Sequence, residues 1–498
     1  MIRPAVGAEK EGTRLPLLRN GKVMNCNEMS FRGKRGKETM NREKILFGSG
    51  EFYKNALKIA IPIMLQQLIQ SMVSLVDNFM VSGLGDISMS GVNVAGQILF
   101  IFMVYVNSIC MTGGIFLTQY FGAREKEGMQ QAFRFKLLMG LMAFVLYFLV
   151  CMVFPRKILS LMLIGNTEAG LILDEAVKYI RIMFFMGIQM TVSVCIASSL
   201  RDMGQVKLPL LVTVIATLTN TLFNWLLIYG NLGFPKMGVQ GAATATVIAR
   251  TLEFLIFIVV YIKMKPEFAI RLFDMFQIDG KLFKEILKKG ALILFCEMVW
   301  VLSETVTTAL YNGRGGADVV SGMSSGFAIG NLFFVAFGGI YSATGVILGK
   351  TLGEGKLEKA RQEKTWLLSG SAVFGVCMMF FGFSTTVLVP VVFGRLSDGA
   401  IEICRNMVIL MSFFMPVWVF MNGQQAVARA GGDTAMGAYT DALLTIFVML
   451  PMVFLLGIYT AIGPVMMYLC VKLLDLIKVV VFQIWLKKER WLKNLTNQ

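Results

Sequence analysis

The sequence predicts an all-α membrane protein, and three observations support this class. Hydrophobic residues make up 56% of the 498 residues and charged residues only 16%, whereas a soluble globular chain carries about 25% charged residues. Apolar stretches long enough to cross a bilayer recur along almost the whole chain. They lack the period-2 alternation of barrel strands, and lipid offers no hydrogen-bond partner to the backbone, so we expect helical spans.

Twelve transmembrane helices are predicted. Each reaches the ~20 residues that a helix needs to cross the hydrocarbon core. In chain order they cover 57–83, 90–121, 133–154, 176–200, 208–230, 240–262, 286–312, 321–349, 365–392, 402–428, 436–459 and 462–486.

Basic residues concentrate in the tail before the first span and in the loops on the same side of the predicted spans. Segment 263–289 holds seven Lys and Arg, and segment 350–364 holds five. The positive-inside rule places this side, with both termini, in the cytoplasm of a multi-pass cell-membrane protein. The net charge of +16 therefore follows from topology. We expect contact with the lipid bilayer and no nucleic-acid partner.

Composition argues against several chemistries. The chain has no histidine, which removes the commonest metal ligand and proton relay. Its eight cysteines are scattered without a C-x-x-C pair, and no Walker A motif occurs. We therefore expect no enzyme, no cofactor and no metal site other than a Na⁺ site. Residues 1–50 are predicted to be a disordered basic tail without a cleavable signal.

The chain repeats itself at an offset of about 230 residues. Ser90-Gly91 matches Ser321-Gly322 at 231, and Arg201 with its neighbours matches Arg429 with its neighbours at 228. An offset of six spans gives both halves the same topology, so a pseudo-two-fold axis along the membrane normal is expected.

The repeat divides the chain into two six-helix lobes. We predict an N-lobe over 51–262, a cytoplasmic linker over 263–285, a C-lobe over 286–492 and a short tail over 493–498. Two such bundles normally hold a substrate between them and alternate by rocking.

Five motifs occur in an order that resembles the MATE (multidrug and toxic compound extrusion) family. They are PIMLQQ at 62–67 with LVDNFMVSG at 75–83, SLRDMG at 199–204, GVQGAATAT at 238–246, GKTLGEGKLEKA at 349–360 and RAGGDT at 429–434. The resemblance covers roughly 51–492, and its implied fold of twelve helices in two lobes agrees with the repeat.

The resemblance implies a secondary active antiporter that exports small cationic or amphipathic organic compounds in exchange for Na⁺ or H⁺, working as a monomer. The alternative is a lipid-linked oligosaccharide flippase of the same superfamily. A flippase needs a cationic cavity for pyrophosphate, whereas the intramembrane charges of this chain are mainly acidic. A cationic substrate is therefore favoured.

One carboxylate, Asp77, is the only charge between Lys58 and Asp86. A carboxylate inside a span is costly and often marks an ion or proton pathway. It shares one helical face with Gln66, Gln70 and Ser74, and the fifth span carries a similar stripe of Thr213, Thr217, Asn220 and Asn224. One carboxylate with amide and hydroxyl oxygens suits Na⁺, and the same carboxylate can instead take up a proton.

The family resemblance assigns roles to these positions. Asp77 falls on the ion-coupling aspartate of the first helix, and Asn220 and Asn224 fall on fifth-helix positions of the N-lobe cation site. Thr246 matches a sixth-helix threonine of that site. Some relatives have Asp where this chain has Asn224, so one carboxylate fewer is expected here.

The second lobe has its own candidates for binding substrate or ion. Glu297 resembles the seventh-helix glutamate of NorM-type members, and Glu304 and Trp300 share its helix. Asp441 lies early in the eleventh span, where a helix-packing role is equally open. NorM-type members also have an aspartate in the tenth helix, but segment 414–425 of this chain has no carboxylate, so a NorM-like Na⁺ site in this lobe is in doubt.

The remaining intramembrane charges are expected to be structural. Arg250 with Glu253, and Lys472 with Asp475 and Lys478, have spacings that allow pairing on one helix face. Arg201 and Arg429 are expected to extend to the interface or to cap the helices that precede them.

Overall fold

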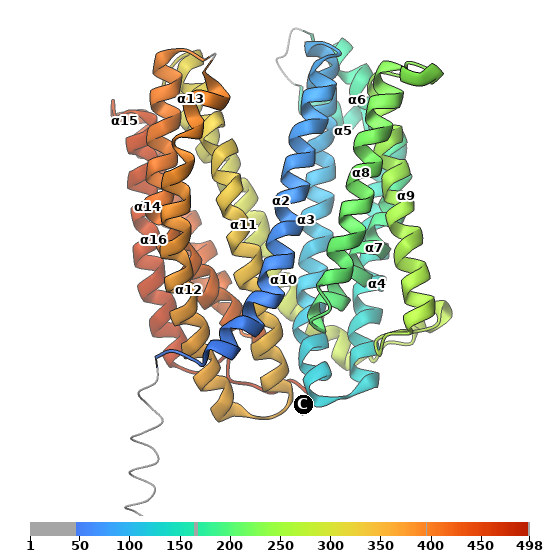
Figure 1. Cartoon of the computed structure of the whole chain (residues 1–498), viewed down its shortest axis with the longest axis vertical. Coiled ribbons are helices and arrows are strands. Elements are labelled where there is room, and N and C mark those ends of the chain that lie inside the picture. Colours follow the sequence, from blue (N-terminus) through green and yellow to red (C-terminus); the bar gives the residue numbers. More distant parts are fainter. Residues whose placement is uncertain (1–45, 164–167, 395, 497–498) are drawn as a thin grey trace, which may run out of the picture. The chain divides into compact units, whose positions relative to one another are not determined.

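The protein is described by a computed structural model that covers residues 46–163, 168–394 and 396–496 (Figure 1). The membrane-spanning body is the unit Ser49–Gln498. The predicted disordered tail falls almost entirely outside the described residues, as do positions 497 and 498. The described part of the chain consists of helices and connecting turns, without a β-strand.

The helices of the first half correspond to six predicted spans. Their bounds are α2 (Gly50–Ser82), α3 (Asp86–Ala123), α4 (Lys126–Phe148) continued by η1 (Leu149–Val153), α6 (Ala169–Met183) with α7 (Met186–Asp202), α8 (Lys207–Tyr229) and α9 (Val239–Met264). Short helices α5 (Pro155–Leu161), η2 (Asn231–Gly233) and η3 (Leu272–Phe276) lie in the connections.

The second half supplies the other six. They are α10 (Gly280–Asn312), α11 (Ala317–Gly353), α12 (Leu357–Thr385), α14 (Asp398–Ala430), the series η4 (Gly437–Ala442), η5 (Thr445–Met449) and α15 (Leu450–Tyr459), and α16 (Pro464–Lys487), with α13 (Leu388–Phe393) before α14. Within the described residues nine or ten segments are long and apolar enough to span a membrane by composition alone. The charged helices α10 and α16 complete the twelve.

Many helices begin earlier than hydropathy predicts, because polar caps extend them beyond the apolar core. The Ser49 side chain accepts from the Phe52 N–H at 3.3 Å, and the Asp279 side chain accepts from the Lys281 N–H at 3.1 Å. The fourth predicted span is bent, since α6 and α7 meet at 52°. The eleventh span begins with two π-helical turns, a form often found at functional sites.

Helix contacts define two bundles, one from α2 to α9 and one from α10 to α16. Figure 1 shows the first bundle in blue to green and most of the second in yellow to red. Each has its own buried core, centred in the first on α3, α4 and α7 and in the second on α11 and α14. The bundles meet where α11 packs against α2 and α3, and where α10 packs against α3.

A tight interface joins the bundles at the end formed by the α3–α4 and α11–α12 turns, here called the basic end. The Gln119 side chain of α3 is fully buried and donates to the Ala430 carbonyl of α14 at 2.8 Å. Its oxygen accepts from the Leu495 N–H at 2.7 Å. Trp491 is buried in a cluster of the second bundle and Leu495 in the core of the first. The C-terminal segment therefore bridges the two bundles.

Candidate functional site

A cavity of about 1200 Å³ lies between the bundles and is lined by both. It exceeds the ~300–1000 Å³ of ordinary ligand pockets. Seven acids and five bases face it, together with aromatic and amide side chains. The acids are Asp77, Asp202, Glu253, Glu297, Glu304, Asp441 and Asp475, and the bases are Arg201, Arg250, Arg429, Lys472 and Lys478.

Asp77 lies on α2 and is held by two asparagines of α8. Asn224 donates its amide to Asp77 Oδ1 at 2.6 Å. An ionised carboxylate only accepts hydrogen bonds, so the Asn220 amide nitrogen must face Asp77. In this orientation the nitrogen donates to the two Asp77 oxygens at 2.9 and 3.1 Å, and the amide oxygen lies 3.2 Å from Thr246 Oγ1. Three of the predicted partners, Asn220, Asn224 and Thr246, are thus gathered around Asp77.

A second cavity of about 300 Å³ lies inside the first bundle, and Asp77 faces it as well as the central cavity. Ser74 and Thr246 also line both spaces. The inner cavity is polar, since Asn78, Asn93, Gln97, Tyr179 and Asn224 contribute to its wall. Asp77 therefore stands at the junction between a polar interior space and the space between the bundles.

Asp77 differs from the other cavity acids in having no cationic partner. Each of the other six has a Lys or Arg nitrogen within 4 Å, from 2.5 Å for Glu253 with Arg250 to 3.8 Å for Glu304 with Lys472. Among the described residues Asp77 has none. The groups that contact its carboxylate directly are amides, so the site is suited to exchange a proton or a small cation.

The oxygen atoms present fit such a cation. No group of three His, Cys, Asp or Glu side chains that could hold a metal occurs within the described ranges. Na⁺ is a hard cation and takes carboxylate, amide and hydroxyl oxygens. Asn224 Oδ1 is buried without a hydrogen-bond partner. Rotation of that amide would turn this oxygen toward an ion at Asp77.

The other predicted members of this site lie elsewhere on the same face. Gln66 donates to Thr213 Oγ1 at 2.8 Å and lies 3.4 Å from an Arg201 nitrogen. It is therefore engaged away from Asp77. Gln70 lines the central cavity between Gln66 and Asp77 and is exposed there.

Arg201 and Arg429 lie in the last turns of α7 and α14, and both line the central cavity. Arg429 contacts Glu297 at 3.3 Å and lies over the Tyr341 ring at 5.6 Å. Because the two arginines are repeat mates, Glu297 beside Arg429 corresponds to Gln66 beside Arg201. In the C-lobe the arginine is thus paired with the predicted acid Glu297, whereas in the N-lobe Arg201 lies beside the amide of Gln66.

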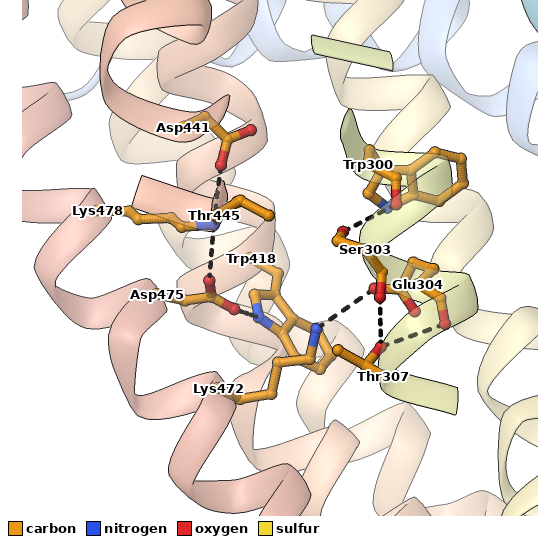
Figure 2. A network of polar contacts seen from close by, with 10 residues as sticks. All are labelled: Trp300, Ser303, Glu304, Thr307, Trp418, Asp441, Thr445, Lys472, Asp475 and Lys478. Atoms are coloured by element: carbon orange, nitrogen blue, oxygen red, sulfur yellow. Dashed lines mark hydrogen bonds and ion pairs between the residues drawn. The ribbon is translucent and has the colours of Figure 1, made fainter. Parts of the chain in front are cut away.

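Figure 2 shows the network around the other C-lobe candidates. Lys478 of α16 donates to Asp441 at 2.8 Å and lies 3.6 Å from Asp475. Asp475 also accepts from the Trp418 indole N–H at 2.8 Å. The predicted pairing of Asp475 with Lys478 is confirmed, and Asp441 is brought into the same network by a contact that sequence spacing did not indicate.

Glu304 and Trp300 face the cavity from α10. Glu304 lies 3.8 Å from Lys472 of α16, and Trp300 is half exposed. Lys472 thus pairs across the bundle and not within its own helix.

Sequence reasoning missed a buried ion pair in the first bundle. Lys136 of α4 is fully buried and donates to Asp202 at 2.6 Å, to Ser198 at 3.1 Å and to Ser199 at 3.0 Å. The signal that could have found it is a lysine inside the third predicted span.

Two six-helix bundles, an internal repeat and a polar cavity between them define a membrane carrier. The MatE family model matches residues 62–226 and 293–455, which together make up more than half of the chain. The chain belongs to the MATE family of membrane transporters. The two matched segments begin 231 residues apart, in agreement with the sequence repeat.

Curated relatives are similar over most of their length. The uncharacterized transporter YisQ of Bacillus subtilis is 22% identical, with 81% of this chain and 87% of the relative covered. A probable multidrug resistance protein NorM of Thermotoga maritima is 24% identical, with 77% and 81% covered.

Solved structures share the fold. A MATE structure in complex with MaL6 is 19% identical and superposes with a TM-score of 0.78, covering 89% of this chain and 97% of that one. An outward-facing multidrug resistance MATE family transporter is 18% identical with a TM-score of 0.76, covering 89% and 96%.

Proposed function

We propose that the protein is a multidrug exporter that exchanges small cationic or amphipathic organic compounds for Na⁺ or H⁺. The central cavity would hold the substrate, and Asp77 would hold the coupling ion. The names of the NorM relatives support multidrug resistance as the biological role.

The observation that carries this proposal is the isolation of Asp77 among seven cavity acids. An ion pair holds a carboxylate in its charged form, whereas a carboxylate that contacts only amides can exchange a bound proton or cation at modest cost. Its position between two polar cavities gives an ion a way in and out. Ion binding there would favour one arrangement of the bundles and substrate the other.

The conformation supports an outward-facing assignment. The interface around Gln119 closes the basic end, which the positive-inside rule places in the cytoplasm. Release of this interface, including the C-terminal segment, would open the cavity to the cytoplasm. Alternating access would then be a rocking of the two bundles around α2, α10 and α11.

The charges of the cavity bear on the class of substrate. Six acids have a Lys or Arg nitrogen within 4 Å, although Asp441 and Asp475 share Lys478, so the acidic excess is smaller than the sequence suggests. Arg429, Lys472 and Lys478 are likewise engaged by carboxylates. No cluster of free cations for a pyrophosphate occurs among the described cavity residues, which favours an organic cation over a lipid-linked oligosaccharide.

The test is transport by purified protein in liposomes with Na⁺ and pH gradients imposed separately. We expect one of the two gradients to drive movement of ethidium against its concentration, and the ion that drives it identifies the coupling ion. Movement of an undecaprenyl-linked sugar with no response to either gradient would overturn the proposal in favour of a flippase.

A further inference from the structure

The C-lobe wall of the cavity contains a cage with the chemistry of a cation site, formed by two aromatic rings and one carboxylate. Trp418 and Tyr468 supply the rings and Glu304 supplies the carboxylate, and all three line the cavity. Aromatic faces beside an acid are the usual means of binding an organic ammonium ion. The cage is formed by α10, α14 and α16 together.

The ammonium group of Lys472 already occupies this cage. Figure 2 shows it between Trp418 and Glu304. Its Nζ lies 5.2 Å from the centre of the Tyr468 ring and 5.6 Å from that of Trp418, within the ~6 Å range of cation–π attraction. Its distance to Glu304 is 3.8 Å, too long for a hydrogen bond. Within the described residues Lys472 makes no hydrogen bond.

The contrast with Lys478 on the same helix shows that this arrangement is not simply that of a buried lysine. Lys478 donates to Asp441 at 2.8 Å and to Thr445 at 3.3 Å. Lys472 has lost water without gaining such acceptors, since its side chain is only 16% exposed. Its contacts are those that a quaternary ammonium or phosphonium ion makes, because these ions have no hydrogen to donate.

The walls of the cage are rigid. The Trp418 indole is fixed by its hydrogen bond to Asp475 and stacks on Phe414 with a centroid distance of 5.6 Å. Tyr468 packs edge-on against Tyr311 and Phe327, each at 5.8 Å. Only the Lys472 side chain, a flexible four-carbon chain, can leave without disturbing the cage.

We propose that Lys472 is a tethered cation that fills the C-lobe cation cage, so that an organic cation must displace it to bind there. This inference rests on the proposed function, because it takes the central cavity as the substrate cavity. Lys472 would act as a specificity-determining residue: it lowers the affinity for simple monovalent cations and favours substrates with enough further contacts to move it.

The test compares binding of tetraphenylphosphonium to the purified full-length protein and its variants, with no ion gradient present. Lys472→Met frees the cage and removes the competing charge. We expect its affinity to rise roughly thirtyfold, the size of a desolvated cation–π contact. Lys472→Arg keeps a cation in the cage and should bind like the wild type. Lys472→Gln provides a second neutral variant if the methionine variant does not fold.

The double variant Lys472→Met with Glu304→Gln should not show the rise in affinity for tetraphenylphosphonium, because it lacks the carboxylate of the cage. Equal or weaker binding by both neutral variants would overturn the proposal, as would a gain that survives Glu304→Gln. Failure of the proposed function has a different signature, namely a wild-type protein that neither binds nor transports any organic cation.

Discussion

Lys136 and Asp77 are both intramembrane charges of the first bundle, yet their surroundings give them opposite properties. Lys136 is fully buried and surrounded by one carboxylate and two hydroxyls. Asp77 faces two cavities and contacts only amides. These contacts suit a structural role for Lys136 and the proposed ion-exchanging role for Asp77.

A structural role for Lys136 can be tested by removing its charge. Lys136→Met leaves Asp202 without its partner, which typically costs about 3–5 kcal/mol. We expect a large fall in the thermal unfolding temperature in detergent. The double variant with Asp202→Asn should regain most of it, and a single variant as stable as the wild type would contradict the role.

At this scale the sequence predicts helical faces well but not contacts between helices. Spacing placed Asn220 and Asn224 on one polar helical face, and the family resemblance then proposed them as partners of Asp77. Gln66 belongs to the same face, but it lies 11 residues before Asp77. That is a rise of about 16 Å along a helix, so the two side chains cannot meet at one ion. The pair Lys472–Glu304 joins residues far apart in the sequence, so no spacing rule could find it.

Two different signals in the sequence determine where each helix lies and where it begins, namely hydropathy and capping. Hydropathy locates the apolar core of a span, while Ser49, Asp279 and Ser397 set where helices begin. The bend between α6 and α7 has no proline to announce it. This explains why twelve spans were predictable and their ends and bends were not.

The close approach of α3 and α11 at the basic end requires glycine. A Cβ at Gly353 would overlap the backbone oxygen of Gln119, whereas a Cβ at Gly345 on the same helix meets nothing within 4 Å. Gly353→Ala should therefore destabilise this conformation by about 1–3 kcal/mol, the usual cost of overpacking.

The measurement is thermal unfolding of Gly353→Ala beside the matched control Gly345→Ala. We expect a lower midpoint for the first and an unchanged midpoint for the second. Equal midpoints would show that the interface at the basic end is looser than the structure describes.

For the whole molecule, orientation follows from the placement of basic residues. The positive-inside rule puts the basic end, with the C-terminal segment, in the cytoplasm. Green fluorescent protein fused after Gln498 should fluoresce, and alkaline phosphatase fused there should be inactive. Alkaline phosphatase fused after Gly233, in the α8–α9 connection, should be active. The reverse pattern would invert the proposed direction of transport.

The central claim is that Asp77 couples ion movement to substrate movement, and the most direct measurement compares two assays on Asp77→Asn in liposomes. Gradient-driven accumulation of ethidium requires coupling, whereas counterflow of ethidium against unlabelled substrate requires only a folded carrier. We predict that the variant loses accumulation and keeps counterflow. Accumulation at the wild-type level by Asp77→Asn would contradict the account.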